Sequence, residues 1–113
     1  MSIRDNKKDQ LQGTLDLLVL RILSSGTGMH GFAISERIEQ VSRDVLRVEA
    51  GSLYPALQKL LIKGWVKAAW RESESGRQVR EYRITTSGKR QLEAEVAEYR
   101  RMASAIGLLL DQE

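Results

Sequence analysis

Apolar residues recur every three or four positions through the first part of the chain, as they do on one face of a helix. The first such run predicts a helix over residues 12–24, with apolar positions at Leu15, Leu18, Val19, Ile22 and Leu23. The serines and glycines of residues 24–28 end it, because these residues favour turns. A second helix is predicted over residues 30–41, with apolar positions at Phe32, Ile34, Ile38 and Val41. Residues 45–49, VLRVE, predict either a brief strand or an extended link.

Residues 51–64, GSLYPALQKLLIKG, predict a third helix over 52–63 with two unlike faces. Ser52 is a candidate N-cap, Pro55 is tolerated in the first turn, and Gly64 suits the position after the last turn. One face is an apolar stripe made by Leu53, Leu57, Leu60 and Leu61. The opposite face carries basic and hydrogen-bonding side chains, namely Tyr54, Gln58, Lys59 and Lys63.

Two short runs rich in aromatic and β-branched residues come next, WVKAAWR (65–71) and VREYRIT (79–85). The segment ESESGRQ between them is typical of a turn, so the pattern predicts a β-hairpin. Alternation places Tyr82 and Ile84 on one face of the second strand and Arg83 on the other. Arg77 falls in the tip of the hairpin, and Arg80 lies beside it.

No proline interrupts residues 86–110, which predict one long helix capped by Thr85 or Thr86. Its apolar positions are spaced four and three residues apart, as in a heptad seam: Leu92, Val96, Tyr99, Ala103, Ile106 and Leu110. At about 1.5 Å per residue such a helix is roughly 37 Å long, more than the core of a small domain covers. We therefore expect the last four of these residues to pack on a partner helix, which predicts a homodimer.

Composition narrows the class of protein. The chain has 113 residues, enough for one domain, and 42% hydrophobic and 29% charged residues, which disfavours disorder. It has no cysteine, which excludes disulfides and the usual zinc-finger and iron–sulfur sites. We expect no metal and no cofactor. The apolar runs are too short to span a membrane, and the polar residues 1–10 predict a flexible arm without a secretory signal. A cytoplasmic protein is expected.

The net charge of +3 is unevenly distributed. Residues 51–85 contain seven lysines and arginines and three glutamates, which gives +4, while the remainder sums to −1. A local basic surplus is either a solvated face or the electrostatic footprint of nucleic-acid binding. It coincides here with the third helix and the hairpin.

Three helices followed by a hairpin are the element order of a winged helix-turn-helix, whose second paired helix lies in the major groove of DNA. The fold class predicted is therefore mainly α with a small β-hairpin and a long C-terminal helix. The domain organisation predicted is an arm (1–10), a winged helix-turn-helix (11–85) and a dimerisation helix (86–113).

Three blocks of this sequence resemble the PadR family of transcriptional regulators: LQGTLDLLVLRILSSGTGMHGFAISERI (11–38), VEAGSLYPALQKLLIKGWV (48–66) and REYRITTSGKRQL (80–92). The resemblance implies the subfamily with a single C-terminal dimerisation helix. The DNA-binding residues that it and the charge pattern imply are Ser52, Tyr54, Pro55, Gln58, Lys59, Lys63, Arg77 and Arg80. The family often has a basic residue followed by two aromatics in the second wing strand. Here Glu81 stands between Arg80 and Tyr82, and it would repel a phosphate if it faced DNA.

Other chemically notable residues have structural interpretations. His30, the one histidine, is a poor metal site alone and is predicted either to start a helix or to stand in a turn. Asp16 is a candidate helix cap, a candidate partner of Arg21, or a residue without a notable role. Trp65 and Trp70 are predicted to pack the hairpin onto the helices. The alternative is a pocket for a small hydrophobic effector, because some members of the family bind flat hydrophobic compounds at the dimer centre.

The function predicted is a homodimeric repressor that binds a pseudo-palindromic operator in double-stranded DNA. The alternative is a protein–protein adaptor that uses the winged helix as a docking surface. An enzyme is not expected, since the sequence has no nucleophile–base set, phosphate loop or metal cluster.

Overall fold

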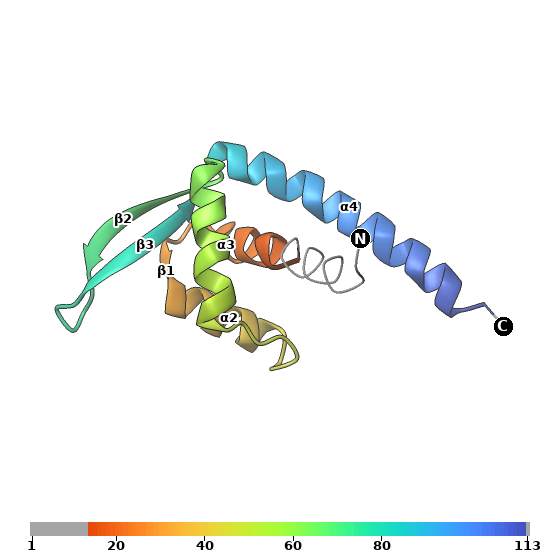
Figure 1. The fold of residues 1–113 in the computed structure, drawn as a ribbon, viewed down its shortest axis with the longest axis horizontal. Coiled ribbons are helices and arrows are strands. Elements are labelled where there is room, and N and C mark those ends of the chain that lie inside the picture. Colours follow the sequence, from red (N-terminus) through yellow and green to blue (C-terminus); the bar gives the residue numbers. More distant parts are fainter. Residues whose placement is uncertain (1–13, 113) are drawn as a thin grey trace.

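The computed structural model describes residues 14–112, and it has the element order that the sequence predicts. A first helix is described from residue 14 to residue 23. It is followed by β1 (Met29–His30), α2 (Gly31–Val41), α3 (Ala50–Ile62), β2 (Val66–Glu72), β3 (Gln78–Ile84) and α4 (Thr86–Leu110) (Figure 1). The predicted fold class is confirmed. The predicted arm over residues 1–10 and the predicted start of the first helix lie outside the described residues.

The hairpin and α4 leave the helical body in different directions, which gives the molecule two projections (Figure 1). Its extents of 58 × 30 × 28 Å record this elongation. The core is filled by side chains of the first helix, α2 and α3, together with the base of the hairpin. The least exposed of these side chains include Val19, Leu20, Ile34, Leu57 and Leu60. Leu20, which the predicted apolar face omits, is fully buried.

The sheet has three antiparallel strands in the order β1-β3-β2. The hairpin partners are as predicted, with Val66 opposite Ile84 and Ala68 opposite Tyr82, and both residues of β3 face the core. The sequence does not predict β1, because two residues are too few to show alternation. Met29 pairs with Tyr82, so β1 joins the start of α2 to the hairpin. Residues 45–49 form a link and not a strand.

Two predicted helix starts are confirmed by their hydrogen bonds. The His30 Nδ1 atom accepts a hydrogen bond from the Ala33 amide at 3.3 Å, which makes His30 the N-cap of α2. Thr85 Oγ1 accepts from the Gly88 amide at 3.0 Å and caps α4. Each cap satisfies an amide that has no partner within its helix.

The predicted start of α3 is wrong by two residues. The helix begins at Ala50 with Glu49 as its N-cap, and no side chain caps it. Ser52 lies inside the first turn, where its amide donates to the Glu49 carbonyl at 3.0 Å. Pro55 consequently falls in the second turn, where its missing N–H leaves the carbonyl of residue 51 without the usual helical donor.

The end of α3 and the start of α4 are held close together by two glycines. Gly64 adopts a φ of +75° and ends α3 as predicted, with Trp65 donating to the Leu60 carbonyl at 3.0 Å. At Gly88, an added Cβ would lie 2.0 Å from the Trp65 carbonyl oxygen. The first turn of α4 therefore rests on the backbone between α3 and β2, at a distance that only glycine allows.

The second half of α4 extends beyond the body. Leu92 is 7% exposed and Val96 packs against the core, whereas Tyr99 and Ile106 are 47% and 46% exposed and Leu110 is 78% exposed. In the described range 14–112, no helix is long and apolar enough to cross a membrane.

Candidate nucleic-acid interface

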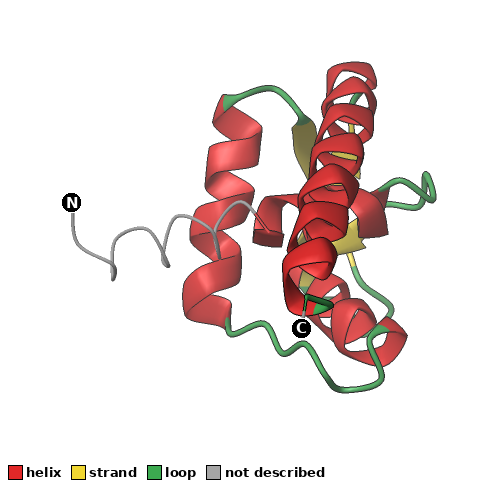
Figure 2. Cartoon of the chain, turned by 90° about the vertical axis from the view of Figure 1, so that its right-hand side faces the viewer, coloured by secondary structure: helices red, strands yellow, loops and turns green. Residues whose placement is uncertain are grey.

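The helix α3 stands on the outer side of the body, separated from α4, as seen at the left of Figure 2. Its inner face is buried and consists of Leu53, Ala56, Leu57 and Leu60. The predicted contact residues Ser52, Tyr54, Pro55 and Gln58 are all exposed. Because Tyr54, Pro55 and Gln58 lie within one turn of each other, they form a hydrogen-bonding and largely uncharged front on this helix.

The Tyr54 side chain packs against the start of α2 on one side and is exposed to solvent on the other. Its side chain lies so close to Gly31 that a Cβ added there would be 2.8 Å from the tyrosine hydroxyl oxygen. The residue is nevertheless 50% exposed. The start of α2 therefore sets the position of the ring, while part of the side chain remains available to a partner.

Lys59 is tied to the first helix by an ion pair. Its Nζ donates to Asp16 Oδ2 at 2.8 Å, and Asp16 is only 3% exposed. Of the alternatives for Asp16, the pairing with Arg21 is not the one formed, since Arg21 donates to Ser24 and Asp16 pairs with Lys59. The Lys59 side chain is 43% exposed and its ammonium has three donors, so it retains capacity toward solvent.

Lys63 lies just after the last helical residue of α3, on the aromatic ring of Trp65. Its Nζ is 4.8 Å from the ring centroid, a cation–π contact. Trp65 itself is partly buried against the core, as predicted. The lysine is exposed, so its charge is displayed at the junction of α3 with the hairpin.

Trp70 does not pack onto the helices, contrary to the prediction, and is 68% exposed. It lies opposite Arg80 in the hairpin, on the strand face that carries Val66 and Ile84 nearer the body. The alternation is as predicted, but the outer half of the hairpin projects beyond the helices. The same face of the hairpin is therefore buried in the core near the helices and exposed to solvent toward the tip.

Tyr82 joins the hairpin to α3. Burial raises the pKa of the Tyr82 phenol, the charge of Arg80 opposes this, and Tyr54 adds to the rise. Tyr82 is consequently a neutral hydroxyl at physiological pH. The Arg80 guanidinium carbon is 6.0 Å from the centroid of the Tyr82 ring, which sets the arginine at the edge of the same surface.

Glu81 lies on the opposite face of the hairpin from Arg80. It accepts from Arg83 at 3.1 Å and pairs with Arg71 at 3.5 Å. A Cβ added at Gly28 would be 2.5 Å from the Glu81 carboxyl carbon, so the glycine makes room for the carboxylate. Glu81 therefore braces the hairpin against residues 26–28 and balances two arginines there, away from the Arg80 face.

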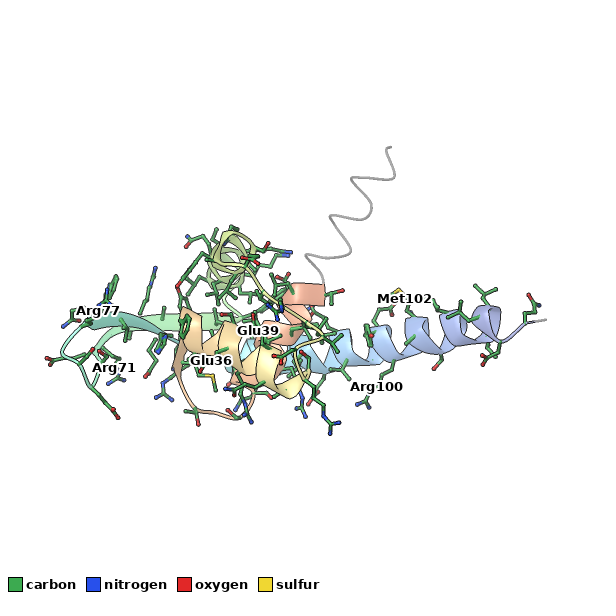
Figure 3. All side chains as sticks on the ribbon, turned by 90° about the horizontal axis from the view of Figure 1, so that it is seen from below. Glu36, Glu39, Arg71, Arg77, Arg100 and Met102 are labelled. Carbon is green, nitrogen blue, oxygen red and sulfur yellow. The ribbon has the colours of Figure 1, made fainter. Side chains whose placement is uncertain are left out.

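Arg77 lies near the far end of the hairpin, well away from the helices (Figure 3). The tip is closed by hydrogen bonds between its ends, with the Ser73 amide donating to the Arg77 carbonyl at 2.7 Å and the Arg77 amide donating to Ser73 Oγ at 3.2 Å. The structure thus brings together two groups of predicted residues, one on α3 and one along the hairpin. Within residues 14–112, no cluster of three or more histidine or acidic side chains forms a metal site.

A second surface runs along the outer half of α4. The predicted dimerisation residues Tyr99, Ala103, Ile106 and Leu110 are exposed in the single chain. Met102 and Arg100 project from opposite sides of the helix (Figure 3). Helical spacing sets Met102 and Arg100 on the two flanks of the apolar seam.

The three helices, the short β1 strand and the projecting hairpin define a winged helix-turn-helix protein with an added C-terminal helix. Residues 19–94 match the family described as "Transcriptional regulator PadR-like family". The chain belongs to this PadR-like family of transcriptional regulators.

Solved structures of transcriptional regulators and one curated relative are similar to this chain over most of its length. A putative transcriptional regulator of Thermoplasma acidophilum is 25% identical, with a TM-score of 0.79 over 93% of this chain and 98% of that one. A PadR-like transcriptional regulator of Bacillus cereus is also 25% identical, with a TM-score of 0.76 over 93% of this chain and 99% of that one. An uncharacterised protein X of Lysinibacillus sphaericus is 27% identical over 93% of this chain and 95% of its own length.

Proposed function

We propose that this protein is a sequence-specific DNA-binding repressor that binds a pseudo-palindromic operator as a homodimer. The observation that carries the proposal is the hydrogen-bonding front of α3, flanked by lysines and continued by the arginines of the hairpin. Uncharged hydrogen-bonding side chains read base edges, and lysines and arginines bind phosphates. The basic surplus of residues 51–85 covers both elements.

In the complex, α3 lies in the major groove, with Tyr54 and Gln58 facing base edges. Gln58 has the amide geometry that pairs with adenine, and the Tyr54 hydroxyl both donates and accepts. Ser52 and Pro55 line the part of the helix that enters first. Lys59 and Lys63 bind phosphates along its flank, and their contribution is affinity more than sequence choice.

The hairpin acts as the wing and reaches the flanking backbone or minor groove. Arg80 and Arg77 are its phosphate contacts, at the middle and near the tip. Trp70, opposite Arg80 and exposed, adds a flat apolar surface that packs on a deoxyribose. Glu81 does not oppose these contacts, because it belongs to the other face of the strand.

The dimer is formed by the outer half of α4, through Tyr99, Ala103, Ile106 and Leu110. A two-fold dimer sets its recognition helices about 34 Å apart, one turn of DNA, and so matches a pseudo-palindrome. Occupying a promoter excludes polymerase, which is sufficient for repression. We expect such a regulator to act in the cytoplasm.

A gel-shift titration with DNA from upstream of the protein's own gene tests the proposal. We expect a shift at or below micromolar protein that weakens as salt rises and survives an excess of scrambled competitor. If scrambled competitor DNA abolished the shift as readily as unlabelled upstream DNA does, the binding would be non-specific. That result would contradict an operator.

The competing function is a protein–protein adaptor. The double substitution Gln58→Ala with Arg77→Ala separates the two, because both side chains are exposed and neither holds the core together. We expect loss of the specific shift, while Arg101→Ala, on the side of α4 opposite the seam, retains it. Unchanged DNA affinity in the double variant would favour the adaptor.

A further inference from the structure

A pocket of about 610 Å³ lies between the first helix, the link before α3 and the flank of α3 itself. This volume is within the range of small-molecule sites, roughly 300–1,000 Å³. Most of the wall is apolar and includes Leu15, Leu18, Leu46, Val48, Pro55 and Ala56. It is separate from the apolar seam of α4, and it adjoins the exposed front of α3, with which it shares Pro55.

A buried carboxylate with unused capacity is part of this wall. Asp16 lines the pocket and is 3% exposed. Its Oδ2 atom accepts from Lys59, but its Oδ1 atom is buried and has no hydrogen-bond partner. A carboxylate accepts through both oxygens, and a buried acceptor without a donor is costly. The site therefore lacks one donor.

The charges around the pocket favour a cation as the source of that donor. Arg47 and Glu49 also line it, but both are exposed and so remain hydrated. Lys59 is partly exposed and already engaged. Asp16 is thus the buried charge in the wall, and a charge-assisted donor binds such a group more strongly than a neutral one does.

We propose that this pocket binds a small amphipathic organic cation, such as a primary amine on a flat apolar body. The ammonium group donates to Asp16 Oδ1, and the apolar body is covered by the leucines and Pro55. A water molecule at Oδ1 would satisfy one acceptor but leave the apolar walls hydrated, which is the less favourable arrangement.

Binding there acts on α3, because the same carboxylate holds Lys59. A ligand ammonium shares Asp16 with Lys59 and weakens the tie between the first helix and α3. This consequence for DNA rests on the proposed function, whereas the pocket and its carboxylate do not. We therefore expect the ligand to lower operator affinity.

Tryptamine is a suitable probe, compared with two matched analogues, neutral tryptophol and anionic indole-3-propionate. Calorimetric titration of the full chain is expected to show binding of tryptamine and much weaker binding of both analogues. Amide shifts in NMR spectra should cluster at residues 15–18, 46–49 and 51–59. Tighter binding of indole-3-propionate would indicate an anion site at Lys59 and overturn the proposal.

Asp16→Asn removes the charge at nearly constant shape and should weaken tryptamine binding about tenfold or more, the usual value of a charge-assisted hydrogen bond. Asp44→Asn is the matched control, since Asp44 does not line the pocket. Unchanged affinity in Asp16→Asn would overturn the assignment of Asp16.

Leu46→Trp provides a test that leaves the ion pair intact. Leu46 is 40% exposed at the pocket wall, so the larger ring fills the cavity without disturbing the core. We expect it to abolish tryptamine binding while the gel shift with DNA persists. No tryptamine binding to the wild type at millimolar concentration, with a normal gel shift, would overturn the ligand site alone. Tryptamine binding without any specific gel shift would overturn the proposed function alone.

Discussion

The hairpin and the outer half of α4 both project from the same body, but they expose different chemistry. The exposed outer hairpin carries Arg71, Arg77 and Arg80 around one exposed tryptophan. The end of α4 exposes a run of aliphatic side chains, with Leu108, Leu109 and Leu110 each at least 70% exposed. A charged projection is stable in water and suits a phosphate backbone, whereas an apolar one is stabilised by another protein surface. The two projections thus predict two different partners.

The largest effect is expected where the apolar projection is given a charge. In the proposed dimer, Ile106→Glu would bury two carboxylates at the two-fold contact, at a cost of about 3 kcal/mol or more per protomer. Sedimentation equilibrium at tens of micromolar should then report a monomer, with operator affinity lost in parallel. Arg101→Glu, on the side of the helix opposite the seam, is the control and should remain a dimer. A truncation after Arg90 is less informative because it also removes Leu92, which belongs to the core.

The base and the end of α4 can be compared through their glycines. Gly88→Ala forces a Cβ against the Trp65 carbonyl oxygen and should lower the free energy of unfolding by about 2–3 kcal/mol. At Gly107 nothing lies within 4 Å of an added Cβ, so Gly107→Ala should raise helix stability by up to about 1 kcal/mol. Thermal unfolding followed by circular dichroism measures both. Equal effects of the two changes would contradict the close contact at Gly88.

The two lysines on the flank of α3 should differ in their effect on stability. Lys59→Met leaves the buried Asp16 carboxylate without its partner and should cost about 1–2 kcal/mol, reduced from the value for a fully buried pair because Lys59 is partly exposed. Lys63→Met removes only a cation–π contact and should cost about 0.5 kcal/mol. Urea unfolding distinguishes them. If Lys59→Met lowered the free energy of unfolding less than Lys63→Met does, the ion pair between Asp16 and Lys59 would not be a stabilising link.

The charged projection is tested through the salt dependence of DNA binding. Arg77→Ala should weaken operator binding several-fold and lower the slope of log affinity against log salt by about 1.8, because each phosphate contact contributes about 0.9 and a dimer has two wings. Fluorescence anisotropy over a range of salt concentrations measures the slope. An unchanged slope would place the tip of the hairpin away from the phosphates.

The smallest expected effect is spectroscopic. Trp70 is exposed and Trp65 is partly buried, so in free protein an aqueous quencher should reach mainly Trp70. Operator DNA should protect it. The variant Trp65→Phe leaves Trp70 as the single reporter, and Trp70→Phe is its counterpart, which should show little change on binding.

Local features of this fold were predictable from the sequence, and contacts between distant segments were not. The bounds of α4 are as predicted because Thr85 caps it and no proline interrupts it. The Asp16–Lys59 pair joins residues 43 positions apart and has no local signal. Trp70 is a second example. Strand alternation predicts which face of the hairpin carries it, but not whether the helices extend far enough to cover it. The start of α3 was misplaced because Ser52 has capping chemistry that the helix does not use.

The close contact between Gly31 and Tyr54 has a consequence for which substitutions would alter the preferred operator sequence. Any larger residue at position 31 would push the tyrosine outward, because a single added carbon already falls 2.8 Å from its hydroxyl oxygen. In the proposed complex, the depth to which α3 can approach a base pair is then adjustable from α2, by a residue that is not among the proposed DNA contacts. A selection for altered operators should accordingly return substitutions at Gly31 as well as on α3.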